Sequence, residues 1–137
     1  MEVVFEVPGE PRGKGRPRFT RDGHAYTDRE TRSYEEKIIA FYLKLVGSFR
    51  FENDAFVSVD VTAIYPIPKT ATKASIAAID EGKILPKKKP DIDNVIKIVL
   101  DSLNGIAYKD DSQVVMVSGK KLYGHEPKLI IKMKGCE

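Results

Sequence analysis

Residues 91–104 read DIDNVIKIVLDSLN, and this stretch decides the fold that we expect. A stripe of apolar residues recurs at helical spacing: Ile92, Ile96, Val99, Leu100 and Leu103. Val95 and Ile98 widen the stripe, which predicts a helix that is buried on most sides. Pro90 precedes the segment and Asn104-Gly105 follows it, as is typical of a helix start and a helix end.

The flanking segments predict a sheet and a second long helix. β-Branched and alternating residues favour strands over 2–7, 55–65, 113–123 and 127–134, the last two joined as a hairpin at Gly124. A helix is expected from about 28 to 46, with Thr27 as its N-cap, and a short helix over 71–81. The simplest way to bury two apolar helix faces is to pack them on one sheet. We therefore predict an α+β fold.

Length and composition fit one compact domain over residues 1–137. A single cysteine, Cys136, rules out a disulfide within the chain and fits a reducing cytosol. The first residues, MEVVFEVPGEPRGKGRPRF, lack the apolar core of a secretory signal, and no window approaches the roughly 18 apolar residues of a membrane span. We expect a cytoplasmic protein without a membrane partner.

Two basic clusters stand out on a chain whose net charge is only +3. The first lies in a Gly/Pro-rich loop and comprises Arg12, Lys14, Arg16, Arg18 and Arg21. The second comprises Lys83, Lys87, Lys88 and Lys89. Such clusters occur on solvated loops, but they also suit a polyanion such as DNA, whose phosphates match arginine forks. Phe19 and Tyr26, beside the first cluster, could stack on bases or belong to the core or its rim.

The acidic residues around 91–104 allow two interpretations. Asp91 and Asp93 could cap the helix and meet its dipole, and Lys97 could pair with acids four residues away. Asp110 and Asp111 could simply form a turn. If the chain folds back after the helix, however, three or four carboxylates could meet and hold Mg²⁺, which prefers oxygen ligands. The lysine run would then hold a polyanion against this acidic pocket, and Lys97 could stabilise charge on a phosphate.

Other chemistry has no support in the residues. His24 and His125 lack zinc-ligand spacing, GEPRGKGR lacks the ending of a nucleotide-binding P-loop, and G-x-S-x-G is absent.

The combination resembles the RusA family of Holliday junction resolvases, which is common in phages and prophages. Its pattern is a basic run, D-x-D-N, a lysine four residues after the second acid, a helix with a central acid, and aromatic-x-D-D-x-Q-V. The matching segments here are KKKPDIDNVIKIVLDSLNG and AYKDDSQVV. The early residues GKGRPRF, YT and YE also resemble the phage-type branch.

The resemblance implies a RusA-like fold with a single mixed β-sheet against two main helices, and a homodimer. It also implies a Mg²⁺-dependent enzyme that cuts two opposing strands of a four-way DNA junction in the host cytoplasm. The implied metal ligands are Asp91, Asp93 and Asp111, and Lys97 is the implied essential lysine. From the residues themselves we add Asp110 as a possible helper and expect the two basic clusters to hold the DNA backbone through Arg12, Lys14, Arg16, Arg18, Lys87, Lys88 and Lys89.

One departure is that the run at 87–89 is all lysine, where arginines also occur in the family. A lysine binds phosphate as a point charge, so the cutting-sequence preference is left open. Two other functions remain open: a nuclease for flaps or forks, and a non-catalytic dimer that binds branched DNA.

Overall fold

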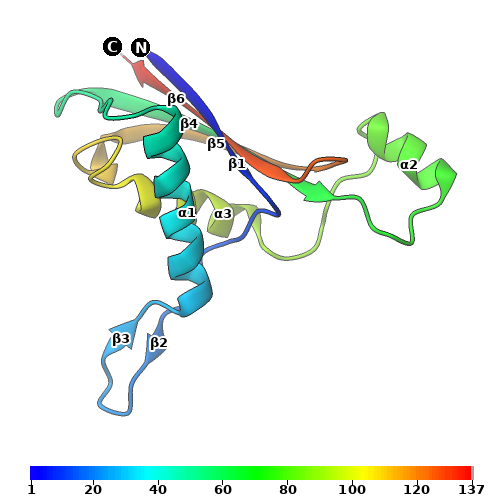
Figure 1. The fold of residues 1–137 in the computed structure, drawn as a ribbon, viewed down its shortest axis with the longest axis horizontal. Coiled ribbons are helices and arrows are strands. Elements are labelled where there is room, and N and C mark those ends of the chain that lie inside the picture. Colours follow the sequence, from blue (N-terminus) through cyan, green and yellow to red (C-terminus); the bar gives the residue numbers. More distant parts are fainter. Residues whose placement is uncertain (137) are drawn as a thin grey trace.

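The structure is a computed structural model that describes residues 1–136. Its elements are β1 (Glu2–Pro8), β2 (Arg18–Phe19), β3 (Ala25–Tyr26), α1 (Arg29–Leu45), β4 (Phe56–Pro66), α2 (Lys73–Asp80), α3 (Ile92–Leu103), a 3-10 turn η1 (Asp111–Gln113), β5 (Val114–Gly124) and β6 (Lys128–Cys136). Among the described residues this is an α+β fold with three α-helices and a mixed main sheet (Figure 1). The predicted class and order of elements are confirmed.

The main sheet has four strands in the order β1-β6-β4-β5. β4 pairs in parallel with β5 and antiparallel with β6, and β1 pairs antiparallel with β6. The predicted hairpin between the last two strands is therefore wrong, because β4 lies between them. Residues 125–127 carry the chain from the end of β5 to the far side of β4, where Lys128 pairs with Ile64.

Burial explains why β4 takes the centre. Val57, Val59 and Val61 are buried at alternate positions of β4, whereas most residues in the first half of β5 are exposed, as suits an edge strand. A β5–β6 hairpin would leave one side of β4 without a partner. The parallel β4–β5 pair needs a long crossover, which α2 and α3 supply.

α1 and α3 pack together on one face of the sheet and enclose the core (Figure 1). The buried face of α3 is rotated from the predicted stripe: Val95 and Ile98 are fully buried, whereas Ile92, Ile96 and Leu100 are only partly buried. The reason is that α3 contacts both α1 and the sheet, so its buried face is centred between these two neighbours.

Gly119 of β5 lies directly against the side chains of Ile96 and Ile92 of α3. A Cβ atom at this position would lie 2.8 Å from Ile96 Cδ1 and 3.3 Å from Ile92 Cδ1. Because these distances are shorter than van der Waals contact, a larger residue at this position would force the side chains of Ile96 and Ile92 to shift.

α1 begins one residue later than predicted. Its N-cap is Asp28 rather than Thr27, and the Asp28 carboxylate accepts a hydrogen bond from the Thr31 backbone N–H at 2.7 Å. This bond lowers the pKa of Asp28. Pairing of Tyr26 with Arg18 keeps the chain extended as far as residue 26, which delays the helix start.

No α-helix among residues 1–136 is both long and apolar enough to cross a membrane.

Candidate active site

The start of α3 presents two exposed carboxylates. Asp91 occupies the N-cap position, but its side chain makes no capping hydrogen bond. It instead forms an exposed ion pair with Lys89, whose Nζ lies 2.9 Å from Asp91 Oδ2. Asp93 lies exposed in the first turn. The capping interpretation of Asp91 thus accounts for its position but not for its carboxylate, which is exposed and held only by the Lys89 ion pair.

Asp93, Lys97 and Asp101 recur every four residues along α3 and so share one side of the helix. The predicted ladder of ion pairs between them is absent among the described residues. Lys97 is exposed and forms no ion pair there, while Asp101 pairs with a residue outside the helix. The Lys97 ammonium is therefore available to an anion from outside.

The acidic turn, residues 109–113, follows α3. Asp110 caps η1 by accepting from the Ser112 N–H at 3.4 Å, and the Gln113 side chain accepts from the Asp110 N–H at 3.2 Å. The hydrogen bond from Ser112 lowers the pKa of Asp110. The pKa of Asp111 is raised, first by its hydrogen bond to Asp110, then by burial and by the charges of Asp110 and Asp101. The pKa values of the two neighbouring acids are therefore shifted in opposite directions.

The acids do not meet as expected. Over residues 1–136, no group of three or more His, Cys, Asp or Glu side chains could hold a metal ion within one chain. Asp91 and Asp93 lie at the start of α3, which at 12 residues is about 18 Å long. Asp111 is close enough to Asp101, near the other end, to feel its charge. The sequence predicted the fold-back but not this separation.

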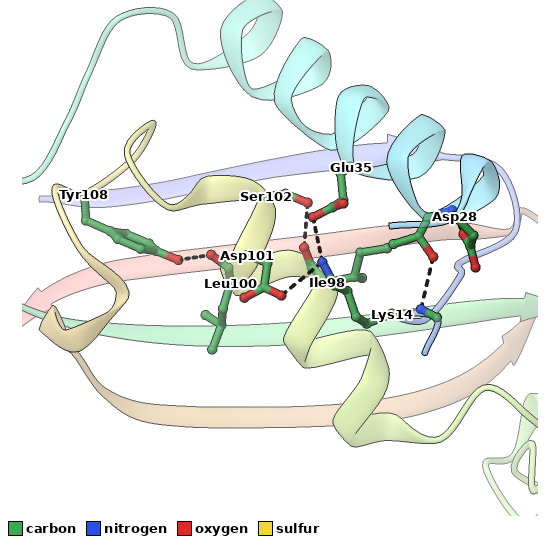
Figure 2. Close-up of polar contacts among 10 residues, drawn as sticks. Lys14, Asp28, Glu35, Ile98, Leu100, Asp101, Ser102 and Tyr108 are labelled. Carbon is green, nitrogen blue, oxygen red and sulfur yellow. Dashed lines mark hydrogen bonds and ion pairs between the residues drawn. The ribbon is translucent and has the colours of Figure 1, made fainter. Parts of the chain in front are cut away.

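Lys14 is the centre of a half-buried ion cluster between α1 and α3. Its Nζ lies 3.1 Å from Glu35 Oε2 and 3.2 Å from Asp101 Oδ2 (Figure 2). Burial tends to lower the pKa of Lys14, but the two carboxylates outweigh it and raise the pKa above its usual 10.5. Only 18% of the Lys14 side chain is exposed. Lys14 therefore belongs to the inside of the molecule, unlike the arginines around it.

The backbone around Lys14 is tied to the starts of both helices. The Lys14 N–H donates to the Asn94 carbonyl of α3 at 2.9 Å, and the Gly15 N–H donates to Thr31 Oγ1 of α1 at 3.1 Å. A Cβ at Gly13 would lie 2.7 Å from Pro90 Cβ, and one at Gly15 would lie 2.6 Å from an Asp28 carboxylate oxygen. Glycines are thus required on both sides of Lys14.

This contact places the basic loop beside the lysine run. A cleft of about 370 Å³ is lined by Arg12, Gly13, Thr31, Lys89 and Pro90, among others. Arg16 and Arg18 are exposed beyond it, and Lys87, Lys88 and Lys89 are exposed before α3. Arg12 pairs only loosely with Glu30, at 4.0 Å. Two positively charged segments therefore flank the exposed carboxylates at the start of α3.

The sequence of this chain is similar to known proteins over nearly its whole length, including the basic loop, α3 and the acidic turn. Residues 8–134 match the family model described as Endodeoxyribonuclease RusA. The chain belongs to the RusA family. It is also similar to a protein of Bacillus subtilis (strain 168), the uncharacterized protein YqaN, with 36% identity over 138 residues that cover 96% of this chain and 95% of that protein. The resemblance stated from the motifs is confirmed.

In this RusA-family chain, two supporting residues escaped sequence reasoning: Glu35 and Thr31, which anchor the Lys14 loop. The pair of glycines around Lys14 was a usable signal, because alternating glycines in a loop often mark close backbone approach. Thr31 carried no such mark, and Glu35 was marked only as part of the YE pair that resembles the phage-type branch, not as a partner of Lys14.

Proposed function

We propose that this RusA-family chain is a Mg²⁺-dependent endonuclease that resolves four-way (Holliday) DNA junctions by symmetric, paired hydrolysis of phosphodiester bonds. The start of α3 carries the proposal: Asp91 holds an N-cap position without capping, and Asp93 and the unpaired Lys97 follow on the same helix. Family membership supports cleavage of DNA, because the family description is that of an endodeoxyribonuclease.

The residues present suit Mg²⁺ in their chemistry. Asp91 and Asp93 would hold the ion at the start of α3. Asp111, with Asp110 as a helper, would join them only if the second chain of the proposed dimer supplied it, because within one chain it lies near the other end of the helix. Magnesium binds through one or two carboxylates and fills its remaining positions with water and phosphate oxygens, so a full cage of side chains is not required. The exposed Asp91 carboxylate, which makes no capping bond and pairs only with the exposed Lys89, fits that need. When bound, the ion supplies Lewis-acid polarisation of the phosphate and lowers the pKa of a coordinated water.

The basic residues of the chain hold and orient the substrate. Exposed Arg12, Arg16, Arg18 and Lys87–Lys89 bind backbone phosphates on both sides of the α3 start. Lys97 lies one turn further along the helix, where its ammonium stabilises negative charge on the scissile phosphate. Lys14, which was expected to bind DNA, is not among the proposed DNA-binding residues, because its ammonium already pairs with Glu35 and Asp101. Its role is to hold the loop that carries the arginines.

Paired cutting suits a homodimer. A four-way junction has approximate two-fold symmetry, and two identical sites related by a two-fold axis reach two opposing strands. We propose such a dimer, acting in the cytoplasm of a bacterial host.

The test is cleavage of labelled four-way, three-way and linear duplex DNA, each with Mg²⁺ or with EDTA. We expect symmetric nicks in the four-way junction alone, only with Mg²⁺, and none from Asp91→Asn, although this variant still binds the junction. Asp54→Asn removes an exposed carboxylate elsewhere and serves as the matched control. Cleavage of all branched substrates alike would favour a flap or fork nuclease. Binding without cleavage under any divalent ion would contradict an enzyme.

A further inference from the structure

Residues 16–26 form an arm that stands away from the body of the molecule (Figure 1). β2 and β3 are only two residues long, and every residue from 16 to 26 is exposed. Thr20 and His24 close the turn, with the Thr20 N–H donating to the His24 carbonyl at 2.9 Å. An isolated two-stranded hairpin gains little stability from its own contacts. The arm therefore has no core to bury its apolar side chains.

Two aromatic residues are nevertheless carried on this arm. Phe19 is 66% exposed and Tyr26 is 47% exposed. Arg18 is opposite Tyr26 and Phe19 is opposite Ala25, so the two aromatic side chains lie on opposite faces of the ribbon. Rings placed this way cannot cover each other, and each face of the arm presents one ring to a partner.

The charge of the arm points to a nucleic acid. Arg16, Arg18 and Arg21 accompany the rings, against a single acid, Asp22. Exposed aromatic rings interleaved with guanidinium groups match a polynucleotide, whose bases stack and whose phosphates accept hydrogen bonds.

Tyr26 also borders a hollow at the base of the arm. The hollow has a volume of about 440 Å³ and is lined by Tyr26, Thr27, Arg29, Arg32, Ser33 and Glu36. Its size falls within the range of pockets for small organic ligands. One ring beside two guanidinium groups provides a stacking surface next to a place for phosphate.

We propose that the arm recognises the branch point, and that Tyr26 stacks on an unpaired base whose flanking phosphates contact Arg29 and Arg32. Phe19 offers a second stacking surface on the opposite face. The proposal rests on the proposed function, because branched DNA is its substrate. Bases in linear duplex are stacked on both sides and unavailable, so this contact distinguishes a junction from a duplex.

The test measures binding in EDTA to a four-way junction with 2-aminopurine at the branch point and to a linear duplex of matching sequence. The variants are Tyr26→Ala, Tyr26→Phe, Phe19→Ala and Arg29→Gln/Arg32→Gln, with Leu43→Ala as the control for losing an exposed apolar side chain. We expect Tyr26→Ala to weaken junction binding about tenfold while duplex binding changes less than about twofold. Tyr26→Phe should bind like the wild type, because it keeps the ring.

The fluorescence change of 2-aminopurine should be present for the wild type and Tyr26→Phe and absent for Tyr26→Ala. Equal losses on both substrates, or no loss for any arm variant, would overturn the inference. A halved sedimentation mass in Phe19→Ala would also overturn it, since a second copy of the chain would then cover the arm. If the wild type still nicks the junction with Mg²⁺, only the arm's role fails; if it neither binds nor cuts the junction, the proposed function fails as well.

Discussion

At the level of single residues, Gln113 fixes the acidic turn. Its Oε1 accepts from the Lys109 N–H at 2.9 Å, and its Nε2 donates to the Glu52 and Ala55 carbonyls at 2.8 and 3.0 Å. The side chain is buried. One amide thus joins the turn that carries Asp110 and Asp111 to the loop before β4.

We predict that Gln113→Leu lowers the free energy of unfolding by about 2 kcal/mol, because it leaves several backbone groups without partners. Urea unfolding measures the change. Ser112→Ala is the control, since none of the hydrogen bonds of the Gln113 amide involves Ser112. Equal stabilities of Gln113→Leu and the wild type would show that the amide does not hold the turn.

Residue-level prediction from sequence worked where a local rule was decisive. Asp91 lies where a helix N-cap was expected, because Pro90 and the apolar repeat mark that boundary. The sequence could not show that the Asp91 side chain makes no capping hydrogen bond, because that side chain pairs with Lys89 instead. The same limit applies to Lys97, whose expected partner Asp101 is taken by Lys14, a residue far away in sequence.

At the level of elements, the Lys14 cluster joins the basic loop to α1 and α3. Its three side chains are each less than one-third exposed, so solvent screens them only in part. We predict that Lys14→Met lowers the free energy of unfolding by about 2 kcal/mol at neutral pH, because two carboxylates then face each other without a cation. Asp101→Asn in the same variant should restore part of the loss, and urea unfolding of both variants measures it.

The pH dependence of this loss follows from the raised pKa of Lys14. A lysine whose pKa is higher in the folded state contributes its full stabilisation below its unfolded value of 10.5 and loses it as pH rises through the folded value. The stability difference between wild type and Lys14→Met should therefore shrink above that range. A difference that stays constant there would mean that packing, rather than charge, causes it.

The lysine run, residues 87–89, is predicted to act through charge alone. Replacing all three lysines by glutamine should weaken junction binding and reduce the slope of log affinity against log salt by about 2–3, because fewer counterions are released. Filter binding from low to high salt measures the slope. Lys69→Gln/Lys73→Gln removes cations elsewhere as the control; an unchanged slope in the triple variant would place the run away from DNA.

Elements were predicted better than their pairing. The ranges of α1, α2, α3 and the four long strands follow from periodicity and from Gly and Pro signals within the chain. The hairpin error arose because a glycine between two strands is a local signal, whereas the insertion of β6 beside β4 depends on which strand must be buried. The expected meeting of Asp91 and Asp93 with Asp111 failed for a related reason. The length of α3 keeps the residues at its two ends apart, although they are close in sequence.

At the level of the whole molecule, the sheet has one covered face and one open face. α1 and α3 cover the face of Val57, Val59 and Val61, while the other face carries Glu2, Asp60 and Lys132 around a cleft of about 600 Å³. The basic segments and the exposed carboxylates at the start of α3 lie on the helix side. One chain therefore presents one candidate site, and paired cutting of a junction needs a second chain.

We predict that the protein sediments at about twice its chain mass of 15.4 kDa at micromolar concentration. Sedimentation velocity over a tenfold dilution series separates a stable dimer from a weak one, and Asp91→Asn should sediment like the wild type because its exposed carboxylate lies outside the core. If the protein is a dimer, its two sites should nick two opposing strands of a junction before the complex dissociates. A monomer at all concentrations would remove the physical basis of symmetric cutting, because two independent encounters would have to find opposing strands. Such a protein would nick junctions singly, as expected of a nuclease for flaps or forks.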